Sequence, residues 1–72
     1  MPLTLIGVGE ISTILKVKGT DKIQRFLESL GFIEGANITI IAHNGGNLIV
    51  NIKDSRVAIS QEMAHKIIVK GA

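Results

Sequence analysis

The segment from residue 20 to residue 35 constrains the fold of this chain more than any other, because it specifies a helix, its end and a return to extended structure. Its apolar side chains follow the i, i+3, i+4, i+7 spacing of one helical face: Ile23, Phe26, Leu27 and Leu30. The hydroxyl of Thr20 is suited to cap the first-turn amides, and Asp21 suits the positive end of the helix. Gly31 can adopt the left-handed conformation that ends the last turn, so the sequence predicts one short helix here.

Short runs rich in β-branched residues surround this helix and predict strands. The turn signal Glu34–Gly35 leads directly into a run of alternating polar and apolar residues, so the helix is an insert between two strands. The Asn44–Gly45 step supplies the positive φ angles of a tight hairpin within a loop at 43–47, and a further turn is expected at 54–55. In chain order, we expect strands at 10–18, 37–42, 48–52, 56–59 and 67–69, with about one helical turn at 60–64.

These elements predict a mainly β fold: a small, SH3-like, five-stranded barrel with one α-helix between strands one and two and a short helical turn before the last strand. A chain of 72 residues is one domain, 1–72, and buries only about 60% of the surface that its unfolded chain exposes. Closing the sheet removes most free edges. The predicted core contains Ile11, Ile14, Val17, Phe26, Leu27, Leu30, Ile38, Ile40, Val50, Ile52, Val57, Ile59 and Val69.

The composition indicates the cellular compartment of the protein and leaves a surplus of apolar residues to explain. The chain has no cysteine, which excludes disulfides and thiolate chemistry and is compatible with a reducing cytosol. Its first residues lack the basic region of a signal peptide, and no apolar run is long enough to span a bilayer, so we expect a cytoplasmic protein without direct membrane insertion. Hydrophobic residues make up 46% of the chain and the mean hydropathy is +0.40. Either a homo-oligomer or partner contact, or simply an aliphatic β-fold, explains this surplus.

Catalytic, metal-binding and nucleic-acid-binding functions find little support in the residues. The net charge of +2 favours phosphates, but the chain has no Tyr or Trp on which bases stack. The two histidines, His43 and His65, have no metal-ligand spacing, although Glu62 and His65 can share a helix face. Ser60 is expected to cap the helical turn rather than act as a nucleophile. We therefore expect no enzyme activity, no cofactor and no metal site, and we favour a solvated basic face over a nucleic-acid contact.

The order and spacing of the motifs along essentially the whole chain resemble those of the FeoA family. The most specific element is an Arg-x-Leu-x-x-Leu-Gly-x-x-x-Gly pattern that begins at Arg25 and ends at Gly35. The remaining matching segments are 3–5, 38–40, 48–52, 57–59 and 64–69. Two departures concern turns: Val8–Gly9 stands where members commonly have Pro-Gly, and the loop 43–47 lacks a proline often found there.

The resemblance implies an SH3-like fold and a role as a small cytosolic accessory of ferrous-iron uptake. It implies protein contact with a FeoB-type ferrous iron transporter, through its cytosolic GTPase domain or its membrane part, at the inner face of the membrane. The residues expected to form this contact are Arg25, Glu28, Phe32, Ile33 and Glu34. For Phe32 and Ile33, covering the core or the helix end is an equally good explanation, and for Arg25 a solvated helix position.

Two other functions stay open at this level. A related SH3-like domain forms part of some iron- or manganese-responsive repressors, so the chain can instead be a module of a metal-responsive transcriptional regulator. A nucleic-acid-binding small barrel is the third alternative. The sequence shows no helix-turn-helix region, which favours the transporter accessory over the regulator.

Overall fold

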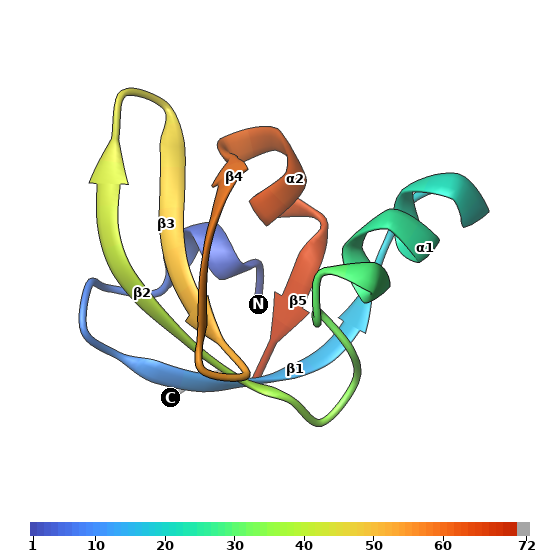
Figure 1. Cartoon of the computed structure of the whole chain (residues 1–72), viewed down its shortest axis with the longest axis horizontal. Helices are drawn as coiled ribbons and strands as arrows, with labels where there is room; N and C mark the ends of the chain where they lie inside the picture. Colours follow the sequence, from blue (N-terminus) through green and yellow to red (C-terminus); the bar gives the residue numbers. More distant parts are fainter. Residues whose placement is uncertain (71–72) are drawn as a thin grey trace.

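The computed structural model describes residues 1–70 of the chain, and its elements follow the predicted order (Figure 1). The chain runs through the 3₁₀ helix η1 (Leu3–Leu5), β1 (Ile11–Val17), α1 (Asp21–Ser29), β2 (Asn37–Asn44), β3 (Asn47–Ile52), β4 (Ser55–Ser60), α2 (Gln61–His65) and β5 (Ile67–Val69). The five strands form one antiparallel sheet in the order β4-β3-β2-β1-β5. This confirms the mainly β, SH3-like arrangement with its inserted helix.

The strand β1 joins the two halves of the barrel. Its residues Ile11 to Thr13 pair with β2, whereas Ile14 to Val17 pair with β5 across an irregularity in register. The strand therefore changes partner partway along its length, which curls the sheet around the core (Figure 1). The two ends of the curled sheet are β4 and β5, and these two strands are not neighbours in the described sheet.

The helix α1 begins and ends as the sequence predicts. The amide of Ile23 donates to the Thr20 hydroxyl oxygen at 3.3 Å, and Gly31 has a φ of 106° just after the last turn. The helix projects from the barrel, so only part of its apolar stripe reaches the core (Figure 1). Leu27 is fully buried, but Phe26 on the adjacent edge of the stripe is 51% exposed, so its assignment to the core is wrong.

The predicted core is otherwise largely correct. Ile11 is an error, because it is 73% exposed. Ile11 and Ile14 are three residues apart on one strand and therefore point to opposite faces, so only one of them can be buried. Val17, Leu30 and Val57 are partly buried against the core. The predicted residues that are fully confirmed as buried are Ile14, Leu27, Ile38, Ile40, Val50, Ile52, Ile59 and Val69.

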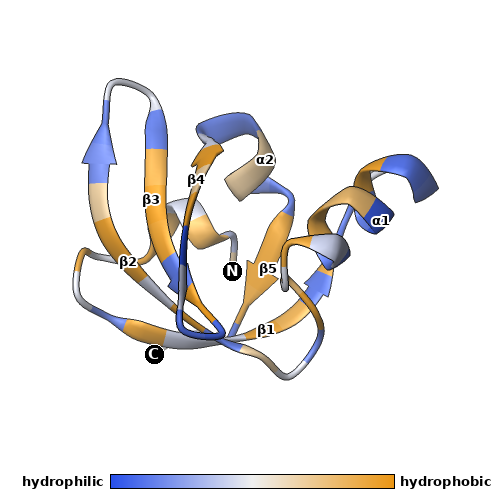
Figure 2. Cartoon of the chain, viewed as in Figure 1, coloured by the Kyte–Doolittle hydropathy of each residue, from blue (hydrophilic) through white to orange (hydrophobic). Residues whose placement is uncertain are grey.

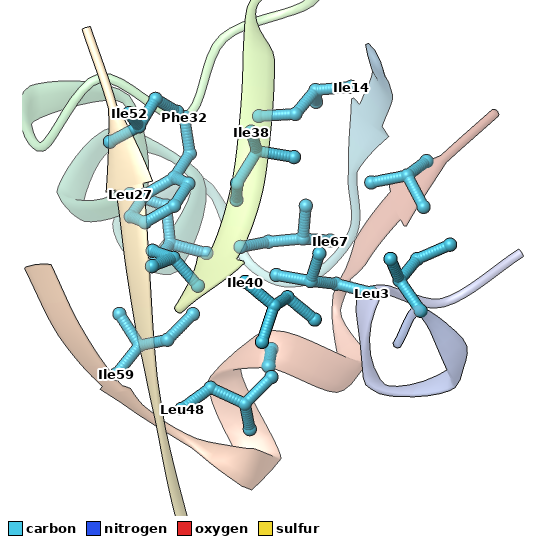
Figure 3. Close-up of a cluster of buried hydrophobic side chains, with 14 residues drawn as sticks. Leu3, Ile14, Leu27, Phe32, Ile38, Ile40, Leu48, Ile52, Ile59 and Ile67 are labelled. Atoms are coloured by element: carbon cyan, nitrogen blue, oxygen red, sulfur yellow. The ribbon is translucent and has the colours of Figure 1, made fainter. Parts of the chain in front are cut away.

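Six buried residues that the prediction omitted complete the core. The 3₁₀ helix η1 was not expected. It packs against β5, which is hydrophobic along its length (Figure 2). It also buries Leu3 in the core (Figure 3). Next to it, Pro2 forms an isolated bridge with Ile68, and the amide of Val69 donates to the carbonyl of Met1 at 2.7 Å. The N-terminal segment thus pairs with the edge of β5 that faces away from β1. The other buried residues that the prediction omitted are Ile6, Phe32, Leu48, Ala64 and Ile67.

The first hairpin is tighter than expected, and the second is shifted by one residue. The β2–β3 connection is only Gly45–Gly46, and these residues have φ angles of 55° and 87°. The β3–β4 connection is Lys53–Asp54, one residue earlier than predicted, with φ angles of 50° and 62°. Two left-handed residues in succession make a two-residue turn that matches the twist of the strands. At the second hairpin, non-glycine residues adopt this conformation.

The difference in burial between neighbouring residues of α1 gives a stability test. We expect Leu27→Ala to lower the free energy of unfolding by about 2–5 kcal/mol, because it leaves a cavity in the core. The matched change Phe26→Ala removes a half-exposed side chain and should cost about 1 kcal/mol or less. Urea unfolding followed by far-ultraviolet circular dichroism measures both values. Equal losses would contradict the packing of α1 described above.

The left-handed conformation of Asp54 gives a second test. We expect Asp54→Gly to raise the free energy of unfolding by about 0.5 kcal/mol. Aspartate has a steric cost at positive φ that glycine lacks, and this cost exceeds the additional conformational entropy that glycine loses on folding. Asp54→Val should lower it by about 1–2 kcal/mol, because a β-branched residue is strained there. Thermal unfolding of both variants checks the signs. As a control, Ser55→Gly at the adjacent strand position should be destabilising.

Candidate functional site

The loop between α1 and β2 is held rigidly by backbone hydrogen bonds. At its start, the amide of Phe32 donates to the carbonyl of Leu27 at 3.0 Å. At its end, the amide of Gly35 donates to the carbonyl of Ile14 at 2.8 Å, and the amide of Ile14 donates to the carbonyl of Ala36 at 2.9 Å. The loop is therefore bonded both to the helix it leaves and to the strand β1. Its conformation is set before any partner binds.

Phe32 and Ile33 are neighbours in this loop but differ in burial. The Phe32 side chain is fully buried and lies among Leu27, Ile38 and Ile52 (Figure 3). This corrects its assignment to the partner-binding surface: Phe32 is a core residue, the other role considered for it, and presents no side-chain surface. Ile33 is 38% exposed, and Glu34 beside it is exposed. We call these two residues the 33–34 ridge.

A shallow cleft of about 590 Å³ runs along one side of the 33–34 ridge. Part of it is the outer face of the sheet, where Ile11 pairs with Thr39 and Thr39 with Asn51 across three strands. The β3–β4 turn, with Lys53 and Asp54, forms a further part of the lining. The sequence prediction missed these five residues as surface lining. For Ile11, its odd spacing from the buried Ile14 was a signal that it points outward.

A smaller cleft of about 230 Å³ lies on the other side of the 33–34 ridge. It is lined in part by Lys16 of β1 and by Gln24 and Glu28 of α1. Of the predicted contact residues, Glu28, Ile33 and Glu34 line this cleft, together with the solvent-inaccessible Phe32 beneath them. Arg25 is exposed on α1 but lines neither cleft. The two clefts carry charges of both signs beside one exposed aliphatic side chain.

A third shallow cleft of about 380 Å³ lies beside α2 and is lined by Thr4, Gln61, Glu62, His65 and Lys66. Ser60 caps α2 as predicted, because the amide of Met63 donates to its hydroxyl oxygen at 3.2 Å. His43 lies near the tip of the β2–β3 hairpin.

Within residues 1–70, no three or more His, Cys, Asp or Glu side chains are grouped as metal ligands. In the same part of the chain, none of the helices has the length and apolar character needed to cross a membrane.

Comparison with known proteins identifies the family. The FeoA domain model matches residues 1–71. No curated protein sequence matches the chain. Among solved structures, an iron uptake regulatory protein (FeoA) is 27% identical, with a TM-score of 0.89 over 97% of this chain and 95% of that one. Stenotrophomonas maltophilia FeoA in complex with zinc, described as a prokaryotic SH3 domain protein, is 25% identical, with a TM-score of 0.85 over 97% and 89%.

The same fold also occurs inside larger regulators. A manganese-dependent transcriptional repressor has a TM-score of 0.86 at 19% identity, and the match covers 96% of this chain but only 40% of the repressor. At this level of identity the likeness shows the fold alone. The family model, in contrast, spans nearly the whole chain, and two FeoA structures match along most of their own length. The chain therefore belongs to the FeoA family of small SH3-like accessory domains of ferrous-iron transport.

Proposed function

We propose that this protein supports ferrous-iron uptake by binding a FeoB-type transporter on its cytosolic side, through the GTPase domain or the membrane part of the transporter. The observation that carries the proposal is the match of the FeoA domain model to residues 1–71. The 27% identical iron uptake regulatory protein (FeoA), which is covered over 95% of its length, supports a role in iron uptake. The protein would then lie in the cytoplasm and reach the inner face of the membrane through its partner.

The 33–34 ridge is the surface best prepared for this contact. Its loop is bonded to Leu27 and Ile14 through the backbone, so binding would order little additional chain and lose little conformational entropy. Ile33 offers an aliphatic side chain between two clefts, and apolar anchors surrounded by polar groups are typical of interface centres. Glu34 and Glu28 would supply acidic contacts that set the orientation of the partner.

The fold likeness to the manganese-dependent repressor supports one alternative, a module of a metal-responsive regulator. The two functions differ in their partner. An accessory of transport binds a membrane transporter, whereas a regulator module binds a DNA-binding chain and responds to a metal ion. Affinity capture from cells grown in iron-limited, low-oxygen medium separates them, since recovery of the transporter supports the accessory role and recovery of a DNA-binding protein supports the regulator.

A binding measurement tests the proposed surface. With the full-length transporter of the same organism in lipid nanodiscs, we expect Ile33→Ser to raise the dissociation constant about tenfold, because it removes the central apolar anchor. Glu34→Lys should weaken binding in the same direction by reversing the charge of the ridge. Biolayer interferometry with immobilised nanodiscs gives the constants.

Leu5→Ser is the matched control for this measurement. Leu5 is 65% exposed and lies on η1, which packs against α2 and β5 rather than the 33–34 ridge. Its affinity should equal that of the unmodified protein. If the control and Ile33→Ser weaken binding equally, or if neither does, the ridge is not the contact. Thermal unfolding of each variant verifies that the fold is retained.

A further inference from the structure

The strand β4 lies at one end of the sheet, and its register shows which of its backbone groups are free. The turn Lys53–Asp54 has two residues, so Ile52 and Ser55 form the hydrogen-bonded pair that closes the hairpin. Hydrogen-bonded and non-hydrogen-bonded pairs then alternate along β3 and β4. Val57 and Ile59 direct their N–H and C=O groups toward β3. The N–H and C=O groups of Arg56 and Ala58 point away from the sheet.

The free side of β4 is accessible. Arg56 and Ala58 are both exposed. The elements that pack most closely against β4 are its hairpin partner β3 and the following helix α2. In the described part of the chain, no loop, turn or cap hydrogen bond reaches the backbone of Arg56 or Ala58. These four backbone groups are therefore left to water or to another strand.

At the opposite end of the sheet, the free edge of β5 is paired with the N-terminal segment. There, Pro2 bridges to Ile68, and Val69 exchanges hydrogen bonds with Met1: its amide donates to the Met1 carbonyl at 2.7 Å, and its carbonyl accepts from the Met1 amino group at 2.8 Å. The N-terminal segment thus occupies the edge at β5. Of the two sheet ends in the described chain, β4 is the one that still offers an unpaired ladder.

We infer that β4 is a self-association edge, at which the β4 strand of a second copy of this chain pairs antiparallel across a two-fold axis through Val57. In this register, Arg56 lies opposite the second copy's Ala58, and Ala58 opposite the second copy's Arg56. Each pair exchanges two backbone hydrogen bonds, so all four free N–H groups of the two strands find a carbonyl partner. The two sheets become one continuous sheet with an isologous interface.

The side chains of β4 fit this register on both faces. On the inner face, Val57 is partly buried beside Val50, and the two-fold axis places it against the second copy's Val57. The apolar row Val50–Val57 thus continues across the interface. On the outer face, the long Arg56 side chain lies opposite alanine, the smallest side chain of the strand. Its aliphatic part can extend over the second copy's Ala58 toward the second copy's Ile49, which pairs with that alanine.

The neighbouring registers are less favourable. A shift that places the axis at Arg56 sets two guanidinium groups directly opposite each other, and like charges at such positions are destabilising. A shift that places the axis at Ala58 pairs Arg56 with the second copy's Ser60, where the chain already turns into α2 and the hydroxyl caps the amide of Met63. A second copy therefore has one preferred register. With so few paired residues, the contact area is below that of a stable dimer, so association should appear only at high protein concentration.

Amide hydrogen exchange by NMR tests the inference on the unmodified protein. In dilute solution, the amides of Val57 and Ile59 should be protected, whereas those of Arg56 and Ala58 should exchange freely. At high concentration, we expect the latter two to become protected, together with a dimer in sedimentation velocity. A single monomeric species at all concentrations would overturn the inference, and so would a dimer in which these two amides still exchange freely. The test is independent of the 33–34 ridge.

Ala58→Pro is the matching variant. Proline removes the outward-pointing N–H and is tolerated at this position of an edge strand, because no bond to β3 is lost. We expect it to abolish the dimer, whereas Ala58→Ser, which keeps the N–H, retains it. A proline variant that dimerises like the unmodified protein would contradict the inference. If the proline variant does not fold, the exchange measurement on the unmodified protein still decides the question.

Discussion

The partner exchange along β1 is the constraint on which the rest of the structure depends. The first half of the strand pairs with β2 and the second half with β5, so one strand of seven residues connects both sides of the barrel. Ile14 lies at this junction. Its side chain is buried in the core, its backbone bonds to Gly35 and Ala36, and it pairs with Val69 on the other side. Core, loop and barrel curvature are thus coupled through one residue.

This junction also explains why the exposed 33–34 ridge is rigid. The chain leaves α1, which projects from the barrel, and re-enters the sheet as β2, the neighbour of β1, within a few residues. Burial of Phe32 and the bonds from Gly35 and Ala36 to Ile14 fix the two sides of this return. The next residue, Ile33, is 38% exposed. The loop that carries this apolar side chain is anchored on both sides, which makes it suitable as an interface.

Local signals in the sequence predicted the elements well, because each has a cause within a few residues. The cap at Thr20 and the glycine after α1 acted as expected. The Asn44–Gly45 step was placed one residue too early, because the positive φ angles of this turn are those of Gly45 and Gly46. The errors concern facts that depend on distant parts of the chain. Phe26 has the spacing of a core residue, but it is exposed because the barrel contacts only one side of α1. Leu3 is buried because η1 packs against α2 and β5, which are far from it in sequence.

For the candidate site, the sequence identified the right segment but not the direction of its side chains. The pattern from Arg25 to Gly35 marks the loop, yet each of its apolar residues has both a core and a surface explanation until the contacts of the loop with β1 are known.

The high mean hydropathy of the chain was equally compatible with a buried core and with an exposed contact surface. Much of it is explained by an aliphatic core, while exposed apolar side chains such as Leu5 and Ile11 remain on different faces. A chain of this size cannot bury all of its apolar residues, so exposure alone does not mark an interface. What distinguishes the 33–34 ridge is exposure combined with a fixed backbone, and what distinguishes β4 is a row of unpaired backbone groups.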